Sequence, residues 1–122
     1  MICDTNFLSQ ILREVQAGRV GPAKRFMARH RAAQFVTTVI SAGELAVIFR
    51  DTQGARDFLS DYRVFRLTPE IAYEASRIER ELAQRLGEND NWIAGFGRYY
   101  GMPVISRDTA FDRVQGLRRL PY

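Results

Sequence analysis

Four acidic residues of this chain have apolar neighbours that would exclude an isolated charge. They are Asp4, Glu44, Asp90 and Asp108. A carboxylate is costly to bury unless positive charge is placed beside it. Four such residues spread through 122 positions, each at the margin of a predicted core, predict one composite acidic site that holds a metal ion.

Each acid also has an ordinary structural explanation. Asp4 can end a strand and accept hydrogen bonds from the amides that follow it, and Glu44 can lie on an exposed helix edge. Asp90 can stabilise the positive end of a helix dipole, because it falls in a first turn. Asp108 can cap the next helix, and this is the strongest of the four structural alternatives.

Carboxylate oxygens are hard ligands that select Mg²⁺ or Mn²⁺. Two divalent cations would neutralise four carboxylates, and one would leave two negative charges. A bound cation lowers the pKa of water and stabilises charge on a phosphate, so no histidine base is needed. The chain has no Gly-rich phosphate loop and no Cys/His cluster, which argues against a nucleotide cofactor and against zinc.

The elements that must position these acids follow from periodicity and turn residues. Apolar runs predict strands near residues 1–4, 34–39, 63–67, 104–105 and 117–120. Helices are expected after a cap at Thr5 or Asn6, and over residues 23–31, 41–49, 69–86, 89–100 and 108–114, with a short one after Gly54. Thr68 and Pro69 form a typical helix start, and Gly87 is expected to end the same helix.

Short apolar strands that alternate with helices predict an α/β fold, with a central, mostly parallel sheet of four to five strands flanked by helices as a three-layer sandwich. Sites in such sheets form beyond the carboxyl ends of the strands. Asp4 and Asp108 follow two of these ends. The face of Asp90, Ile93, Ala94 and Gly97 is expected to turn inward, because its small residues allow a close approach.

Length and composition predict a single domain, residues 1–122, with enough apolar residues for a core. No run is long enough to span a membrane, no signal peptide precedes Asp4, and one cysteine cannot form an internal disulfide, so a cytoplasmic location is expected. The net charge is +4, and 17 of 18 basic residues are arginine. This basic excess suits a polyanion such as RNA, or reflects arginine-rich codon usage.

Four segments, taken in order, resemble the acidic motifs of PIN-domain ribonucleases, and the size is similar to that of VapC-like toxins from bacterial toxin–antitoxin pairs. The segments are Met1-Ile2-Cys3-Asp4-Thr5-Asn6, Thr38-Val39-Ile40-Ser41-Ala42-Gly43-Glu44-Leu45, Leu86-Gly87-Glu88-Asn89-Asp90-Asn91-Trp92-Ile93-Ala94 and Val104-Ile105-Ser106-Arg107-Asp108-Thr109-Ala110-Phe111. The first strand is unusually short, and Ser106 stands where threonine is commoner. None of these departures removes an acid.

The resemblance implies a parallel sheet, an Mg²⁺ or Mn²⁺ site, endoribonuclease activity, a homodimer and a small antitoxin that blocks the site. Asp4, Glu44 and Asp90 would bind the metal and act in catalysis, and Asp108 would complete the cluster. Asn6 and Ser106 would orient the carboxylates. The alternatives are a catalytically silent PIN-like module that binds RNA or protein, and a metal-dependent phosphatase.

Trp92, Phe96, Tyr99 and Tyr100 form an aromatic face of one predicted helix, opposite the face that carries Asp90. Such a face serves either the core or a contact between subunits. We expect it to contribute to a homodimer rather than to stack nucleobases.

Overall fold

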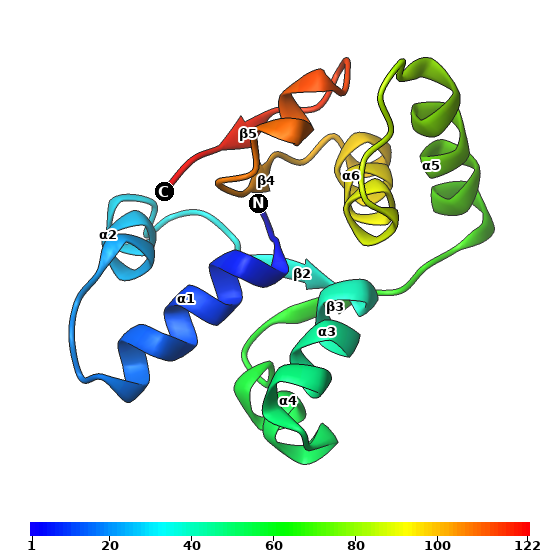
Figure 1. Cartoon of the computed structure of the whole chain (residues 1–122). Helices are drawn as coiled ribbons and strands as arrows, with labels where there is room; N and C mark the ends of the chain where they lie inside the picture. Colours follow the sequence, from blue (N-terminus) through cyan, green and yellow to red (C-terminus); the bar gives the residue numbers. More distant parts are fainter.

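In the computed structural model, which describes all residues 1–122, the chain folds around a five-stranded parallel sheet (Figure 1). The strand order is β3-β2-β1-β4-β5. The strands are β1 (Ile2–Cys3), β2 (Val36–Thr38), β3 (Arg63–Phe65), β4 (Val104–Ile105) and β5 (Arg119–Leu120). The predicted α/β sandwich is therefore confirmed, and every pair of neighbouring strands is parallel.

Two cores lie on opposite faces of this sheet, because successive side chains of a strand point to opposite sides. Ile2 belongs to a core that includes Val104 and Ile93, whereas Cys3 belongs to one that includes Ile105 and Phe7. All of these residues are buried. The central strand β1 is thus covered on both faces, which explains why a two-residue strand is wholly apolar.

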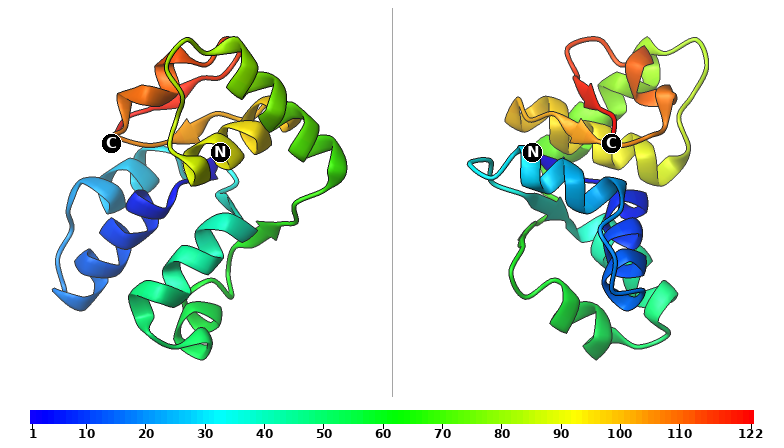
Figure 2. Two further views of the ribbon diagram at one scale, coloured as in Figure 1. Left: turned by 45° about the vertical axis from the view of Figure 1, so that its right-hand side comes forward. Right: turned by 90° about the vertical axis from the view of Figure 1, so that its left-hand side faces the viewer.

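The helices divide between the two faces, as the two further views of the ribbon illustrate (Figure 2). Helices α1 to α4 contribute to the core around Cys3, and α5 and α6 to the core around Ile2. Their bounds are α1 (Thr5–Gln16), α2 (Pro22–Arg29), α3 (Val39–Phe49), α4 (Thr52–Phe58), α5 (Pro69–Glu81) and α6 (Glu88–Tyr100), with a 3-10 helix at Thr109–Arg113.

Helix α6 packs closely because it carries glycine at two contact points. A Cβ on Gly95 would stand 2.9 Å from the Ala75 side chain of α5. A Cβ on Gly97 would stand 2.6 Å from the Leu117 side chain and 3.0 Å from that of Val104 in β4. Such distances are too short for packed carbon atoms, so α6 can approach its neighbours this closely only because Gly95 and Gly97 have no side chain. The expected inward face of α6 is confirmed, since Ile93 is buried.

Several predicted helix ends are wrong, although the start of α5 is correct. The start at Thr68 and Pro69 is confirmed, and the Thr68 hydroxyl accepts from the Ile71 amide. Helix α5, however, ends at Glu81, well before Gly87. Leu86 is still buried, but as a loop residue of the core, so its apolar spacing extended the predicted helix falsely.

The predicted caps of α1 and α6 are also wrong. Asp4, not Thr5 or Asn6, caps α1. Helix α6 begins at Glu88 after Gly87, so Asn89 lies inside the first turn.

The aromatic face of α6 is divided between core and surface. Phe96 is fully buried, so it cannot serve a subunit contact in this fold. Tyr99 and Tyr100 remain exposed at their edges, and the Tyr100 ring stacks on Phe65 with centroids 4.5 Å apart. These tyrosines and the partly exposed Trp92 are left of the expected contact face.

Besides Asp4, one other acid is buried, and this residue, Glu14, was not predicted. Its carboxylate lies at the start of α2 and accepts the backbone amides of Gly21, Ala23 and Lys24 at 2.9–3.0 Å. Gln10 adds a side-chain hydrogen bond at 3.1 Å. These contacts tie α1 to α2, and they satisfy amides that a helix start leaves unpaired.

No helix of the structure combines the length and the apolar character needed to cross a membrane.

Candidate acidic site

The four acids lie at the carboxyl ends of central strands and on two neighbouring helices. Asp4 directly follows β1, and Asp108 follows β4 after two residues. Glu44 lies midway along α3, and Asp90 lies in the first turn of α6. Parallel strands place their ends at one edge of the sheet, so the topology brings residues from both ends of the sequence together.

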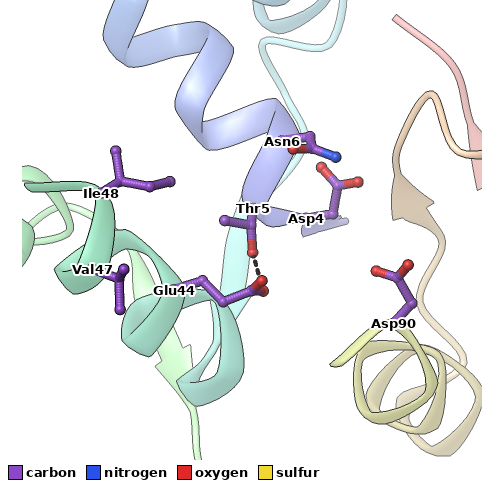
Figure 3. A pocket seen from close by; sticks show the side chains of 7 residues that line it. All are labelled: Asp4, Thr5, Asn6, Glu44, Val47, Ile48 and Asp90. Atoms are coloured by element: carbon purple, nitrogen blue, oxygen red, sulfur yellow. Dashed lines mark hydrogen bonds between the residues drawn. The ribbon is translucent and has the colours of Figure 1, made fainter. Parts of the chain in front are cut away.

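Three of the acids surround one pocket of about 430 Å³. Figure 3 shows the side chains of Asp4, Glu44 and Asp90, which come from three separate segments, around this pocket, with Asn6 above Asp4. The pocket is lined by Asp4, Thr5, Asn6, Glu44, Val47, Ile48 and Asp90. Asp108 is exposed and does not line this pocket, although its charge acts on two of the acids that do.

Asp4 is the most constrained acid of the site. It is 3% exposed, and its Oδ1 accepts the Phe7 amide at 2.7 Å. Burial raises the pKa of Asp4, and the charges of Asp108 and Glu44 raise it further, while hydrogen bonds from Ser106 and the Phe7 amide oppose the shift. The structural alternative is thus partly correct, because Asp4 is a helix cap, but the cap uses only one of its two oxygens.

Glu44 is half-buried and is held by a hydroxyl group. The Oγ1 of Thr5 donates to Glu44 Oε1 at 2.7 Å, and the same Oγ1 lies 3.0 Å from the Oγ of Ser41 (Figure 3 shows the Thr5–Glu44 bond). Val47 and Ile48 follow on the same helix and are largely exposed at the pocket wall. The side chain therefore lies between water and an apolar wall, with one defined partner.

Asp90 is half-buried, and its environment favours the neutral form. Burial raises the pKa of Asp90 to about 6, assisted by the charges of Asp108, Asp4 and Glu44. The Oδ1 of Asp108 accepts the Ala110 amide at 2.9 Å. Asp108 therefore caps the 3-10 helix that follows it, which is the structural alternative given for this residue.

None of the four acids forms an ion pair with arginine or lysine. The chain's ion pairs instead join Arg77, Arg85, Arg98 and Arg119 to acids elsewhere. In the structure no three acidic, histidine or cysteine side chains converge closely enough to hold a metal ion already. The carboxylates line a shared pocket without closing a coordination sphere.

The two residues expected to orient the carboxylates differ in their contacts. Ser106 is fully buried, accepts the Asp108 amide at 3.0 Å and hydrogen bonds to Asp4. Asn6 is exposed at the pocket mouth and makes no hydrogen bond to any of the four acids. Thr5, by contrast, was expected only as a cap, yet it contacts Glu44 directly. The sequence feature that could have indicated a role for Thr5 in the site was its position between Asp4 and Asn6.

Comparison with known proteins gives one family and a group of similar folds. The model of the PIN domain family matches residues 1–117. No curated protein sequence matches the chain.

Among solved structures, the chain is similar to a chain of VapBC2 from Rickettsia felis bound to a DNA fragment from their promoter, with a TM-score of 0.79, 15% identity and coverage of 99% of this chain and 97% of the other. A chain of DNA-bound VapBC from Salmonella typhimurium gives a TM-score of 0.78 at 21% identity, covering 98% and 96%. For VapBC-1 from nontypeable Haemophilus influenzae the values are 0.76 and 17%, covering 98% and 96%. At these identities the likeness shows a shared fold.

Proposed function

Because the chain belongs to the PIN domain family, we propose that residues 1–122 form one nuclease domain that cleaves RNA with the help of Mg²⁺ or Mn²⁺. The observation that carries this proposal is a nearly buried carboxylate, Asp4, beside Glu44 and Asp90 with no cationic side chain paired to any of them. Such a set is costly to maintain unless a cation binds it.

The donor atoms fit a hard divalent ion, since all of them are carboxylate oxygens. Asp4, Glu44 and Asp90 would hold it, and Asp108 would add charge from beside the pocket. When bound, the ion supplies an activated water and stabilises charge on the scissile phosphate. The chain itself fixes Asp4 through hydrogen bonds from the Phe7 amide and Ser106.

The proposal is tested by RNA cleavage with purified protein in Mg²⁺ or Mn²⁺. We expect cleavage that EDTA stops and that Asp90→Asn abolishes. The matched control is Asp61→Asn, because Asp61 is exposed and lies outside the pocket, in the turn before β3. Cleavage that persists in EDTA with no residual metal would refute metal dependence. RNA binding without cleavage by folded wild-type protein would instead indicate the silent binding module, and hydrolysis of small phosphomonoesters alone would indicate a phosphatase.

We further propose that the protein is a cytoplasmic toxin whose partner is a small antitoxin. The support is the shared fold with chains of VapBC structures and with a toxin–antitoxin complex from Klebsiella pneumoniae (TM-score 0.68, 22% identity). Expression of the wild-type chain should arrest bacterial growth, whereas Asp90→Asn should not. The toxin role would be refuted if bacteria that express the wild-type chain keep growing while the wild-type protein is as abundant in the soluble fraction as the Asp90→Asn variant.

The homodimer also remains a proposal. Because Phe96 is buried, the contact would have to use Tyr99, Tyr100 and the partly exposed Trp92. Tyr99→Asp should lower the sedimentation coefficient from that of a dimer to that of a monomer. An unchanged dimer would place the contact elsewhere, and a monomeric wild-type protein at all concentrations would refute it.

A further inference from the structure

The hydroxyl of Thr5 connects the two helices that carry the first two acids. Thr5 is the first residue of α1, directly after Asp4, and its Oγ1 lies 2.7 Å from Glu44 Oε1 of α3. On its other side the Oγ1 lies 3.0 Å from the Oγ of Ser41, which is fully buried. Ser41 and Glu44 are three residues apart on α3, so they face the same side of that helix.

The available protons give this contact a direction. A carboxylate is an acceptor only, so the 2.7 Å contact uses the single hydroxyl proton of Thr5. The Thr5 oxygen must then accept from Ser41, whose own hydroxyl proton completes the chain. The order is Ser41 to Thr5 to Glu44. A hydroxyl that already accepts a hydrogen bond donates more strongly, so Ser41 reinforces the bond to Glu44.

Glu44 needs such a restraint because little else holds it. No arginine or lysine pairs with it, and the adjacent wall consists of Val47, 78% exposed, and Ile48, 51% exposed. A glutamate with several free side-chain torsions would otherwise sample positions in solvent. Figure 3 shows its carboxylate directed toward Thr5 and the centre of the pocket.

We propose that Thr5 is a positioning residue that orients Glu44 for a divalent cation and leaves Oε2 as the free oxygen. This inference rests on the proposed metal-dependent function. Because Oε1 accepts the hydrogen bond from Thr5, Oε2 is the oxygen that Glu44 would offer to the cation. It also makes Ser41 an indirect contributor that acts only through Thr5.

The test is Mn²⁺ affinity, measured by electron paramagnetic resonance on the full chain, with no substrate present. Thr5→Val keeps the shape and removes the hydroxyl, and we expect affinity to fall about 10-fold or more, within the range typical of residues that support metal ligands. Thr5→Ser should restore affinity to within about 3-fold of wild type. The matched control is Ser9→Ala on the same helix, since the Ser9 hydroxyl has no hydrogen-bond partner, and it should leave affinity unchanged.

Non-additivity separates positioning from general loosening. Ser41→Ala should weaken Mn²⁺ binding less than Thr5→Val, and the double variant should bind no more weakly than Thr5→Val alone, because the chain acts in series. Melting temperatures in EDTA show whether each variant is folded. If Thr5→Val is unfolded, the comparison of Thr5→Ser with Ser41→Ala carries the test, and equal losses in both would refute the proposal.

The outcomes also separate this inference from the proposed function. Wild-type protein that shows no saturable Mn²⁺ binding refutes the metal site itself. Wild-type binding that Thr5→Val leaves unchanged refutes the role of Thr5 and keeps the metal site. Losses that add up in the double variant show two independent structural effects, and they also overturn the proposed order of the chain.

Discussion

Replacing Glu14 by glutamine tests how much one buried carboxylate contributes to this fold. Glu14 is fully buried and accepts three backbone amides and one from Gln10. Glutamine has nearly the same shape, but its terminal nitrogen cannot accept a hydrogen bond. In Glu14→Gln one side of the new amide must therefore face backbone donors, which leaves buried groups unpaired.

The magnitude follows from the titration of the native group. Burial alone would raise the pKa of Glu14, but the hydrogen bonds from Lys24, Gln10, Ala23 and Gly21 together lower it to about 2 from its ordinary 4.5. That difference corresponds to roughly 3 kcal/mol at neutral pH, at about 1.4 kcal/mol for each pH unit. We expect Glu14→Gln to lose about 3 kcal/mol of unfolding free energy at pH 7.

The pH dependence gives the sharper check. Because the folded-state pKa is depressed, the stabilisation is complete above pH 4.5 and is lost as pH falls toward 2. The difference between wild type and Glu14→Gln should accordingly shrink to about half by pH 3. Urea denaturation of the metal-free protein at pH 7, 4.5 and 3 measures it.

The control for this experiment is Glu70→Gln, since Glu70 is exposed in the first turn of α5 and has no ion pair. It should change stability by well under about 1 kcal/mol. A Glu14→Gln variant as stable as wild type at pH 7, or a difference that does not vary with pH, would refute the reasoning.

Three further outcomes follow from the structure. The raised pKa of Asp90 means that its ionisation opposes folding, so the metal-free protein should lose stability as pH rises from 4 through 6. The Asp90→Asn variant should be more stable than wild type by about 1 kcal/mol at pH 7 after solvent screening, as measured by urea denaturation. Arg13 lines the groove next to the acidic pocket and has no acidic partner. Arg13→Gln should therefore reduce, by about 0.7, the slope of the logarithm of RNA affinity against the logarithm of salt concentration. The control Arg77→Gln, which removes a residue paired to Glu74, should leave this slope unchanged. Gly95→Val should lower the melting temperature by at least several degrees, since its side chain would collide with α5; an unchanged value would contradict the close packing.

The fold was predictable where local chemistry decides it. Thr68 and Pro69 form a helix start that needs no distant partner, and short apolar runs after turns gave all five strands. The end of α5 was not predictable, because Leu86 continues the apolar spacing while it is buried from a loop. The spacing of apolar residues indicates which residues are buried, and here buried apolar residues continue beyond the last residue of the helix.

The candidate site divides in the same way. Asp4 and Asp108 follow strand ends, so the parallel topology was enough to expect them at one edge of the sheet. The Thr5–Glu44 bond was not accessible, because the two residues are far apart in sequence and no spacing rule links them. Glu14 was missed because its partners are backbone amides, which no residue type reveals.

The position of β1 has a consequence for synthesis of the chain. This strand lies at the centre of the sheet, and one of its neighbours, β4, is translated roughly a hundred residues after it. Until β4 leaves the ribosome, Cys3 and Asp4 have no partner on that side, and Asp90 has only just been added. The strand end that carries Asp4 is therefore paired on this side only after the chain has passed Asp90 and reached β4, so the edge of the sheet that holds the acids forms late in synthesis.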